Sequence, residues 1–154
     1  MLPKYLCIPE NWRSQMKYVT HFYMDLAWRS QYVGVLEMEY AGVHYYFIDN
    51  EFYFAGPKPY GYIHEDIEKF AFFSKAALSA MPLLNFKPDI VHCHDWQTGL
   101  VPVYMKERFH DGEFFRDMKS VMTIHNLKFQ GVWDLQKVKD ITGCLLYTSP
   151  SPRD

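Results

Sequence analysis

The sequence has little of several features that would assign it to a special class of protein. It contains only three cysteines in 154 residues, Cys7, Cys93 and Cys144, which are too sparse for a disulfide framework or a zinc cluster, so we expect a reducing, cytoplasmic compartment. Its apolar runs all fall short of the roughly 18–20 residues of a membrane helix, and its start lacks the charged head and apolar core of a signal peptide. The formal net charge of −2 argues against nucleic acid or an anionic membrane as partners.

Aromatic residues, in contrast, are abundant. They make up 18% of the chain, with twelve Tyr, twelve Phe and four Trp, which is enough either to fill a core or to present ring faces to sugars. A chain of this length supports one domain with a real core rather than two.

The first half of the chain predicts strands followed by a loop. Segments rich in β-branched and aromatic residues predict strands at 15–26, 32–38 and 43–48. Tyr40-Ala41-Gly42 lies between the last two and predicts a hairpin. Residues 54–62 (FAGPKPYGY) concentrate Gly and Pro and predict a loop.

A long helix is predicted after this loop. Apolar and small residues recur at three- and four-residue steps on one face, namely Ile67, Phe70, Ala71, Ser74, Leu78 and Met81. His64-Glu65-Asp66 places acids in the first turn, where they favour the helix dipole. Pro82 is expected to end the helix, and near the end of the chain Asp134 is expected to cap a last helix that holds Leu135, Val138 and Ile141.

The second half predicts a βαβ unit. A short buried strand at 89–92, a helix at 99–109 and a buried strand at 120–124 follow one another within about thirty residues. The crossover rule makes the strands parallel, so both carboxyl ends meet at the same edge of the sheet. His94-Asp95-Trp96-Gln97 and His125-Asn126 come directly after those ends. Ligands of open α/β sheets bind at such an edge, and we therefore expect the two clusters to line one crevice.

A metal site is one interpretation of these clusters. His92 and His94 share a strand face, and Asp95 and His125 could join them. However, Cys93 would point away, and the spacings match no structural zinc pattern.

Two further chemical interpretations remain, together with a purely structural one. A nucleophile–histidine dyad is weak, because Ser120 lies at the far end of its strand and Cys93 is predicted to be buried. A polar sugar or nucleotide pocket would use Asp95 and Asn126 as hydrogen-bond partners. The structural interpretation makes His92 a core residue and Asp95 the N-cap of the following helix, and capping is compatible with ligand contact.

The two motifs resemble a known family. HCHDWQTGLVPVY followed by TIHNLKFQG is similar to the N-terminal domain of bacterial glycogen synthases and plant starch synthases, whose pattern is a strand ending in H-x-H-D-W, a helix, and a strand ending in T-x-H-N with a glycine a few residues on. The segments NEFYF (50–54) and EDIEKFAFFSKAAL (65–78) also look like that family. The resemblance covers residues 1 to about 143.

This resemblance implies the α/β, Rossmann-like N-terminal domain of a GT-B glycosyltransferase. It implies transfer of glucose from ADP-glucose to the non-reducing end of an α-1,4-glucan, glycogen or starch, with retention of configuration and with neither metal nor cofactor. By motif position, His125 would hold the donor glucose and Asp95 would organise the cleft, both as catalytic residues. Trp96 and Asn126 would meet the donor or the acceptor glucan, and Tyr60 in the G-x-x-x-Y loop is a candidate on the acceptor side.

The resemblance also implies parts that this chain lacks. Residues 1–143 would be a partial catalytic domain without the family's K-x-G-G loop and C-terminal domain, so we expect this segment alone to be inactive. Residues 144–154 break in composition from the rest and translate from a string that resembles a sequencing adapter, so we expect a non-native tail. Two alternatives stay open: a GT-B enzyme with another nucleotide sugar, and a non-catalytic glucan-binding module. Glycogen versus starch, chain-length preference and oligomeric state are undecided from the sequence.

Overall fold

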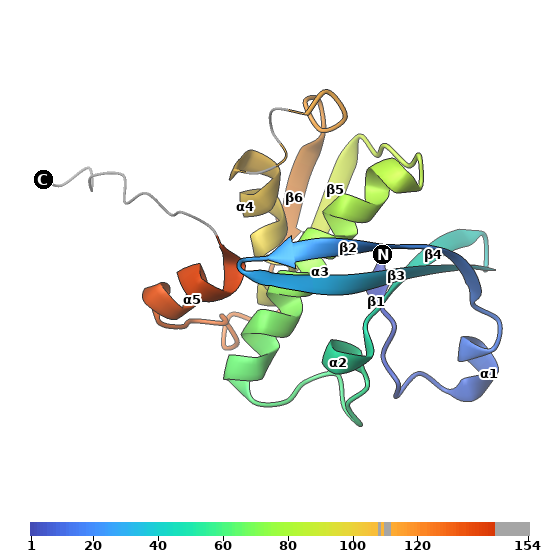
Figure 1. The fold of residues 1–154 in the computed structure, drawn as a ribbon, viewed down its shortest axis with the longest axis horizontal. Helices are drawn as coiled ribbons and strands as arrows, with labels where there is room; N and C mark the ends of the chain where they lie inside the picture. The colour runs from blue at the N-terminus through green and yellow to red at the C-terminus, as the bar shows by residue number, and fades with distance from the viewer. Residues whose placement is uncertain (108, 110–111, 144–154) are drawn as a thin grey trace, which may run out of the picture.

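The computed structural model describes residues 1–107, 109 and 112–143 (Figure 1). The predicted tail, residues 144–154, lies outside the described residues, so its separation from the domain stays a prediction. In chain order the elements are β1 (Leu2–Pro3), α1 (Glu10–Arg13), β2 (Lys17–Leu26), β3 (Arg29–Tyr40), β4 (Val43–Asp49), α2 (Glu51–Phe54), α3 (Ile63–Leu83), β5 (Ile90–His94), η1 (Trp96–Thr98), α4 (Leu100–Glu107), β6 (Lys119–Thr123) and α5 (Leu135–Thr142).

Four strands form the first sheet, in the order β1-β4-β3-β2. β1 is parallel to β4, whereas β2, β3 and β4 are antiparallel neighbours, so the strands predicted in this region are confirmed. The predicted hairpin is also confirmed, since β3 and β4 join through Ala41 and Gly42, which have φ of 50° and 75°. Short α2 was not predicted, and Asn50 caps it by accepting a hydrogen bond from Tyr53 N.

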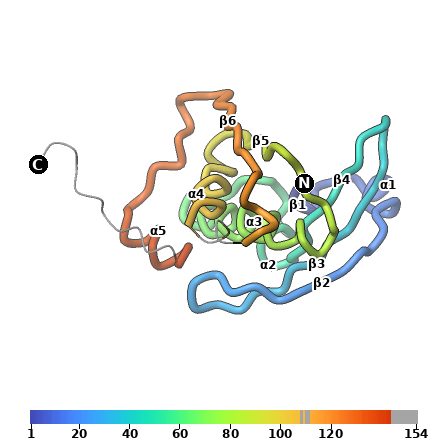
Figure 2. Tube along the Cα trace, turned by 90° about the horizontal axis from the view of Figure 1, so that it is seen from above, coloured from blue at the N-terminus to red at the C-terminus, as the bar shows by residue number. Residues whose placement is uncertain are grey.

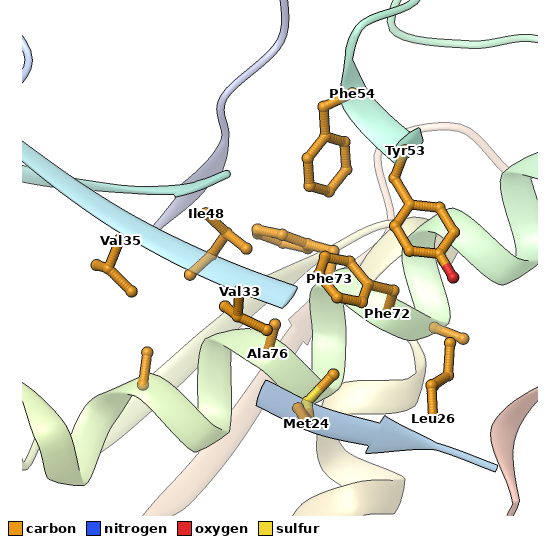
Figure 3. Packing of buried hydrophobic residues seen from close by; sticks show 12 residues of the cluster. Met24, Leu26, Val33, Val35, Ile48, Tyr53, Phe54, Phe72, Phe73 and Ala76 are labelled. Atoms are coloured by element: carbon orange, nitrogen blue, oxygen red, sulfur yellow. The ribbon is translucent and has the colours of Figure 1, made fainter. Parts of the chain in front are cut away.

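Helix α3 lies between two hydrophobic clusters. On one side it packs against the four-stranded sheet, where apolar side chains of β2, β3, β4 and α2 meet Ala71, Phe72, Phe73 and Ala76 (Figure 3). On the other side its Leu78 and Met81 pack with residues of β5, α4 and the segment before β6, namely Cys93, Val101, Tyr104, Phe115 and Met118. Burial on two faces explains why so many of its residues are apolar.

The end of α3 differs by one residue from the prediction. Pro82 does not end the helix, which runs to Leu83. A proline in the last turn removes only one backbone donor, and the turn is closed regardless by Leu84 N donating to Ala80 O at 3.0 Å.

The βαβ unit is confirmed. β5 and β6 are parallel and pair from Ile90 with Lys119 to His94 with Thr123, and η1 and α4 connect them. The prediction that both strands are buried is wrong. Within β5 only Cys93 is buried, and the residues of β6 are exposed or half-buried. In the described part of the chain, α3 and α4 cover the face to which Cys93 belongs, while residues such as Val121, 46% exposed, lie on the open face.

The final helix forms as predicted. Asp134 Oδ1 accepts a hydrogen bond from Lys137 N at 3.0 Å, which confirms the cap of α5. Figure 2 shows residues 124–134 leaving β6 along the outside of the molecule and returning to α5 beside the hairpin of β2 and β3. No helix among the described residues is long and apolar enough to cross a membrane.

Candidate functional site

The carboxyl ends of β5 and β6 are joined by two hydrogen bonds. Asp95 N donates to Thr123 O at 2.9 Å, and His125 N donates to Asp95 Oδ1 at 2.7 Å. The two polar clusters, predicted from different parts of the sequence, are therefore in direct contact at one edge of the sheet.

Asp95 is not a helix cap. It precedes η1 but makes no side-chain cap bond within the described residues, because its carboxylate is turned across the strand ends toward the backbone of His125. Its backbone has φ 57° and ψ −176°, a conformation that residues other than glycine rarely adopt. The Thr98 hydroxyl closes this turn by accepting from His94 N at 2.7 Å and donating to His94 O at 2.8 Å.

Three histidines form a row on this edge. His94 Nδ1 lies 3.0 Å from His125 Nε2 with the rings stacked, and the His92 and His94 ring centroids are 4.2 Å apart. His92 Nε2 also contacts Thr123 Oγ1 at 2.7 Å. His92 is exposed, so its interpretation as a core residue is wrong, because it projects from the uncovered face of β5.

Neither a metal nor a thiol nucleophile finds support in this geometry. Among the described residues no group of three or more His, Cys, Asp or Glu side chains is arranged to hold a metal ion. Cys93 is buried as predicted, and desolvation raises the pKa of its thiol, which disfavours the reactive thiolate, although a hydrogen bond with Thr98 acts in the opposite direction.

A cavity of about 540 Å³ opens beside this edge. It brings together four of the five predicted site residues, Tyr60, Asp95, Trp96 and Asn126. Of the described residues, the remaining lining consists of Gly61, Ile63, Asp66, Gln97, Lys128, Phe129, Gln130, Gly131 and Val132. His125, the fifth predicted residue, directly precedes Asn126 in the sequence. It is exposed at the same edge of the sheet but does not line the cavity, and its role stays a prediction.

Trp96 forms one wall and is fixed from two sides. Phe70 of α3 meets its ring edge-on, with centroids 5.3 Å apart and planes at 86°. Gly131 lies against the indole so closely that a Cβ there would be 2.4 Å from Trp96 Cε3, and its φ is 61°. The glycine that follows the T-x-H-N motif therefore allows the loop after β6 to approach the tryptophan.

Two residues of the site were missed by the sequence reasoning. Asp66 was assigned only to the helix dipole, and Lys69 was given no role. Both are buried, at 4% and 8% exposure, and form an ion pair whose N–O distance is 2.5 Å. Their three-residue spacing on the apolar face of α3 was the available signal, because a charged residue there must find a partner.

Comparisons with known proteins fit this arrangement. A family model of the starch synthase catalytic domain matches residues 1–151. The chain belongs to this family. It is 73% identical over 143 residues to a glycogen synthase of Lachnospira eligens, covering 93% of this chain and 30% of that protein. It is 64% identical over 147 residues to a glycogen synthase of Lachnoclostridium phytofermentans, covering 96% of this chain and 31% of that protein.

A solved structure confirms the fold class. The catalytic domain of Starch Synthase IV from Arabidopsis thaliana, bound to ADP and acarbose, superposes with a TM-score of 0.78 at 24% identity, covering 91% of this chain and 29% of that chain. The predicted α/β fold, that of the N-terminal domain of this glycosyltransferase class, is thus confirmed. The chain spans about 30% of the length of the curated relatives that it matches.

Proposed function

We propose that this chain forms one side of the active site of a glucan synthase, which transfers glucose from ADP-glucose to the non-reducing end of an α-1,4-glucan with retention, in cytoplasmic glycogen biosynthesis. The observation that carries the proposal is the 540 Å³ cavity at the carboxyl ends of the parallel strands, which joins aromatic rings to a carboxylate and an amide. Flat rings pack on the apolar faces of a pyranose, and the polar groups suit its hydroxyls.

His125 would act on the donor glucose from the edge of this cavity. A retaining transfer develops positive charge at the anomeric carbon, so a hydrogen bond to the sugar that tightens in the transition state accelerates the reaction. The bond from His125 N to Asp95 Oδ1 fixes the backbone that carries the imidazole, and His94 holds the ring from the other side. The proposal includes no metal and no cofactor, as the family resemblance implies, and ADP is the leaving group that the donor substrate brings.

A chimera provides the test. Residues 1–143 replace the aligned segment of the Lachnospira eligens glycogen synthase, and incorporation of labelled glucose from ADP-glucose into glycogen is measured. We expect activity, because the replaced segment is 73% identical. A folded chimera that binds glucan but transfers no glucose would contradict the proposal and favour a non-catalytic glucan-binding module.

A matched pair of amide variants localises the activity to the cavity. Asn126→Ala removes a lining residue, whereas Gln136→Ala removes an exposed amide of α5 that lies outside the cavity lining of the described residues. We expect the first to lower the rate of transfer at least about tenfold and the second to leave it unchanged. Equal rates in the two variants would show that this cavity is not the reacting site.

A further inference from the structure

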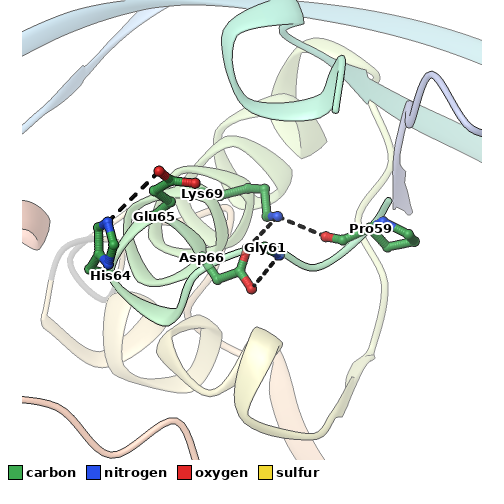
Figure 4. Close-up of polar contacts among 6 residues, drawn as sticks. All are labelled: Pro59, Gly61, His64, Glu65, Asp66 and Lys69. Atoms are coloured by element: carbon green, nitrogen blue, oxygen red, sulfur yellow. Dashed lines mark hydrogen bonds and ion pairs between the residues drawn. The ribbon is translucent and has the colours of Figure 1, made fainter. Parts of the chain in front are cut away.

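Asp66 and Lys69 are the feature of this site that the proposed reaction does not explain. They lie one turn apart near the start of α3, and their side chains are buried, although charged side chains are almost never buried without a specific partner (Figure 4). A buried ion pair contributes little net stability compared with apolar residues of similar volume. Its presence on the packed face of α3 therefore suggests a role in fixing geometry.

Both members of the pair hold the backbone of the same loop, residues 56–61, which we call the Tyr60 loop. Gly61 N donates to both oxygens of the Asp66 carboxylate, at 3.1 and 3.0 Å. Lys69 Nζ donates to Pro59 O at 2.7 Å (Figure 4). The pair thus holds the residue before and the residue after Tyr60.

The residue between these two anchors is exposed and faces open space on two sides. Tyr60 is 59% exposed, and the centroid of its ring lies 6.1 Å from that of the Phe70 ring. It lines the 540 Å³ cavity and also a second cavity of about 510 Å³ on the α2 side of the loop. With Gly56, Pro57 and Pro59 around it, the loop has no regular secondary structure to fix the ring.

We propose that the buried Asp66–Lys69 pair positions Tyr60 as a platform for the acceptor glucan, so that both members are positioning residues for the transfer. This rests on the proposed function above, because it concerns the acceptor in that same reaction. The pair anchors the backbone at Pro59 and Gly61, and the ring is left free to pack on a glucose unit that enters from either cavity.

The test is a double-mutant cycle in the chimera described above. Tyr60→Ala, Lys69→Met and the double variant are compared for kcat and KM with a maltooligosaccharide acceptor at saturating ADP-glucose. We expect each single variant to lose roughly ten- to a hundredfold in kcat/KM for the acceptor, with the KM for ADP-glucose unchanged. The double variant should lose no more than the worse single variant, because both changes remove one function.

Two further variants separate positioning from loss of a charge. Lys69→Arg keeps a cation within reach of Asp66 and should restore most of the acceptor kcat/KM. His64→Gln is the matched control, because it breaks the exposed pair between His64 and Glu65, 3.7 Å apart in the same first turn, and should change nothing. Hydrogen–deuterium exchange of residues 56–61 should be faster in Lys69→Met than in His64→Gln.

If Lys69→Met does not fold, Gly61→Pro tests the same anchor of the Tyr60 loop. Gly61→Pro removes the N–H that Asp66 accepts and leaves both buried charges in place. Gly61→Ala keeps that N–H, and its Cβ would meet nothing closer than 3.6 Å. We expect Gly61→Pro to lower the acceptor kcat/KM more than Gly61→Ala does, because only the proline removes the N–H that the Asp66 carboxylate accepts.

The outcomes distinguish the two proposals. If the unmodified chimera transfers no glucose, the proposed function fails and this inference fails with it. If the chimera is active but the losses of Tyr60→Ala and Lys69→Met multiply, or Lys69→Met only lowers the melting temperature, the positioning role is wrong and the proposed function stands.

Discussion

At the scale of single residues, Asp95 contributes its carboxylate to the site while its backbone adopts a conformation that is unfavourable for any residue except glycine. Its φ of 57° and ψ of −176° lie in a region that glycine adopts readily, while its carboxylate accepts from His125 N. Such strain persists only where the surrounding structure over-determines it, and it is common at functional sites. The free-energy cost of this backbone conformation and the contribution of the carboxylate to stability can be measured separately.

We predict that Asp95→Gly unfolds at a higher urea concentration than Asp95→Ala. Both variants lose the carboxylate, so both lose the bond to His125, but only glycine relieves the backbone. The difference should be about 1–2 kcal/mol in the free energy of unfolding, with little difference in activity between the two. Equal midpoints for the two variants would show that residue 95 is unstrained.

His125→Ala should reduce turnover far more than stability. The imidazole is exposed, so its removal opens no core cavity, and the backbone bond to Asp95 is kept. In the chimera we expect kcat to fall roughly 10²–10³-fold and the melting temperature to change little, whereas Asp95→Ala should lower both. Early melting of His125→Ala with near-normal kcat for the folded fraction would instead make it a packing residue.

The sequence predicted which residues meet at this site better than it predicted what each one contacts. Asp95 and Asn126 could be placed at one edge, because parallel strands connected by one crossover end on the same side. The bond from His125 N to Asp95 could not be predicted, because it depends on the unusual backbone angles of Asp95. Lys69 and Asp66 were missed, because a helical pattern assigns faces but does not show that a loop closes over one of them.

At the scale of elements, the loop after β6 is fixed by a contact between a glycine and a tryptophan. Gly131 has a positive φ, and any side chain there would overlap the Trp96 indole. Both Gly131 and Trp96 line the cavity, so the cavity keeps its shape only if the loop and the indole keep their spacing.

Gly131→Ala should therefore destabilise the fold by more than the strain of a positive φ alone, because the new methyl group would also overlap Trp96. Gly42→Ala in the β3–β4 hairpin is the matched control, since its φ is 75° and a Cβ there would meet nothing within 4 Å. We expect about 1 kcal/mol of destabilisation at Gly42 and about 2–4 kcal/mol at Gly131. Urea unfolding of both variants checks this, and equal losses would mean that the Trp96 contact is loose.

Secondary structure was predictable here, whereas the exposure of one whole face of β5 and β6 was not. The strands β2 to β6 appear where β-branched, aromatic and apolar segments predict them, and the helices α3 and α5 appear where the helical spacing predicts them. The apolar residues of β5 and β6 nevertheless read as a fully buried pair, because an apolar run does not show whether one face or two are covered. In the described residues, Val121 and Ile124 are 46% and 60% exposed.

At the scale of the whole molecule, α3 connects the sheet, the βαβ unit and the site. Its apolar residues complete both clusters, Phe70 supports Trp96, and Asp66 and Lys69 hold the Tyr60 loop. One helix therefore sets the distance between Tyr60 and Trp96, two aromatic residues that line the cavity. A change in its packing should affect the site even where no cavity residue is altered.

The last helix closes the described fold at Gly143. Its φ of 63° ends α5 in the left-handed conformation, and its N–H donates to Lys139 O at 2.9 Å. A Cβ at this glycine would be 2.9 Å from Ala27 Cα in the turn between β2 and β3, so the helix end packs tightly on the hairpin. This contact joins the C-terminal part of the fold to the first sheet.

We predict that truncation after Gly143 leaves the stability of the fold unchanged, whereas substitution of Gly143 lowers it. If residues 144–154 lie outside the fold, their removal leaves the core and the helix cap intact and should change the melting temperature of the chain by less than about 2 °C. Gly143→Ala, the control, adds a methyl group against the hairpin at a positive φ and should cost about 2–4 kcal/mol. Thermal unfolding of the 154-residue chain beside both variants decides the matter: a large loss on truncation would mean that the final eleven residues belong to the domain.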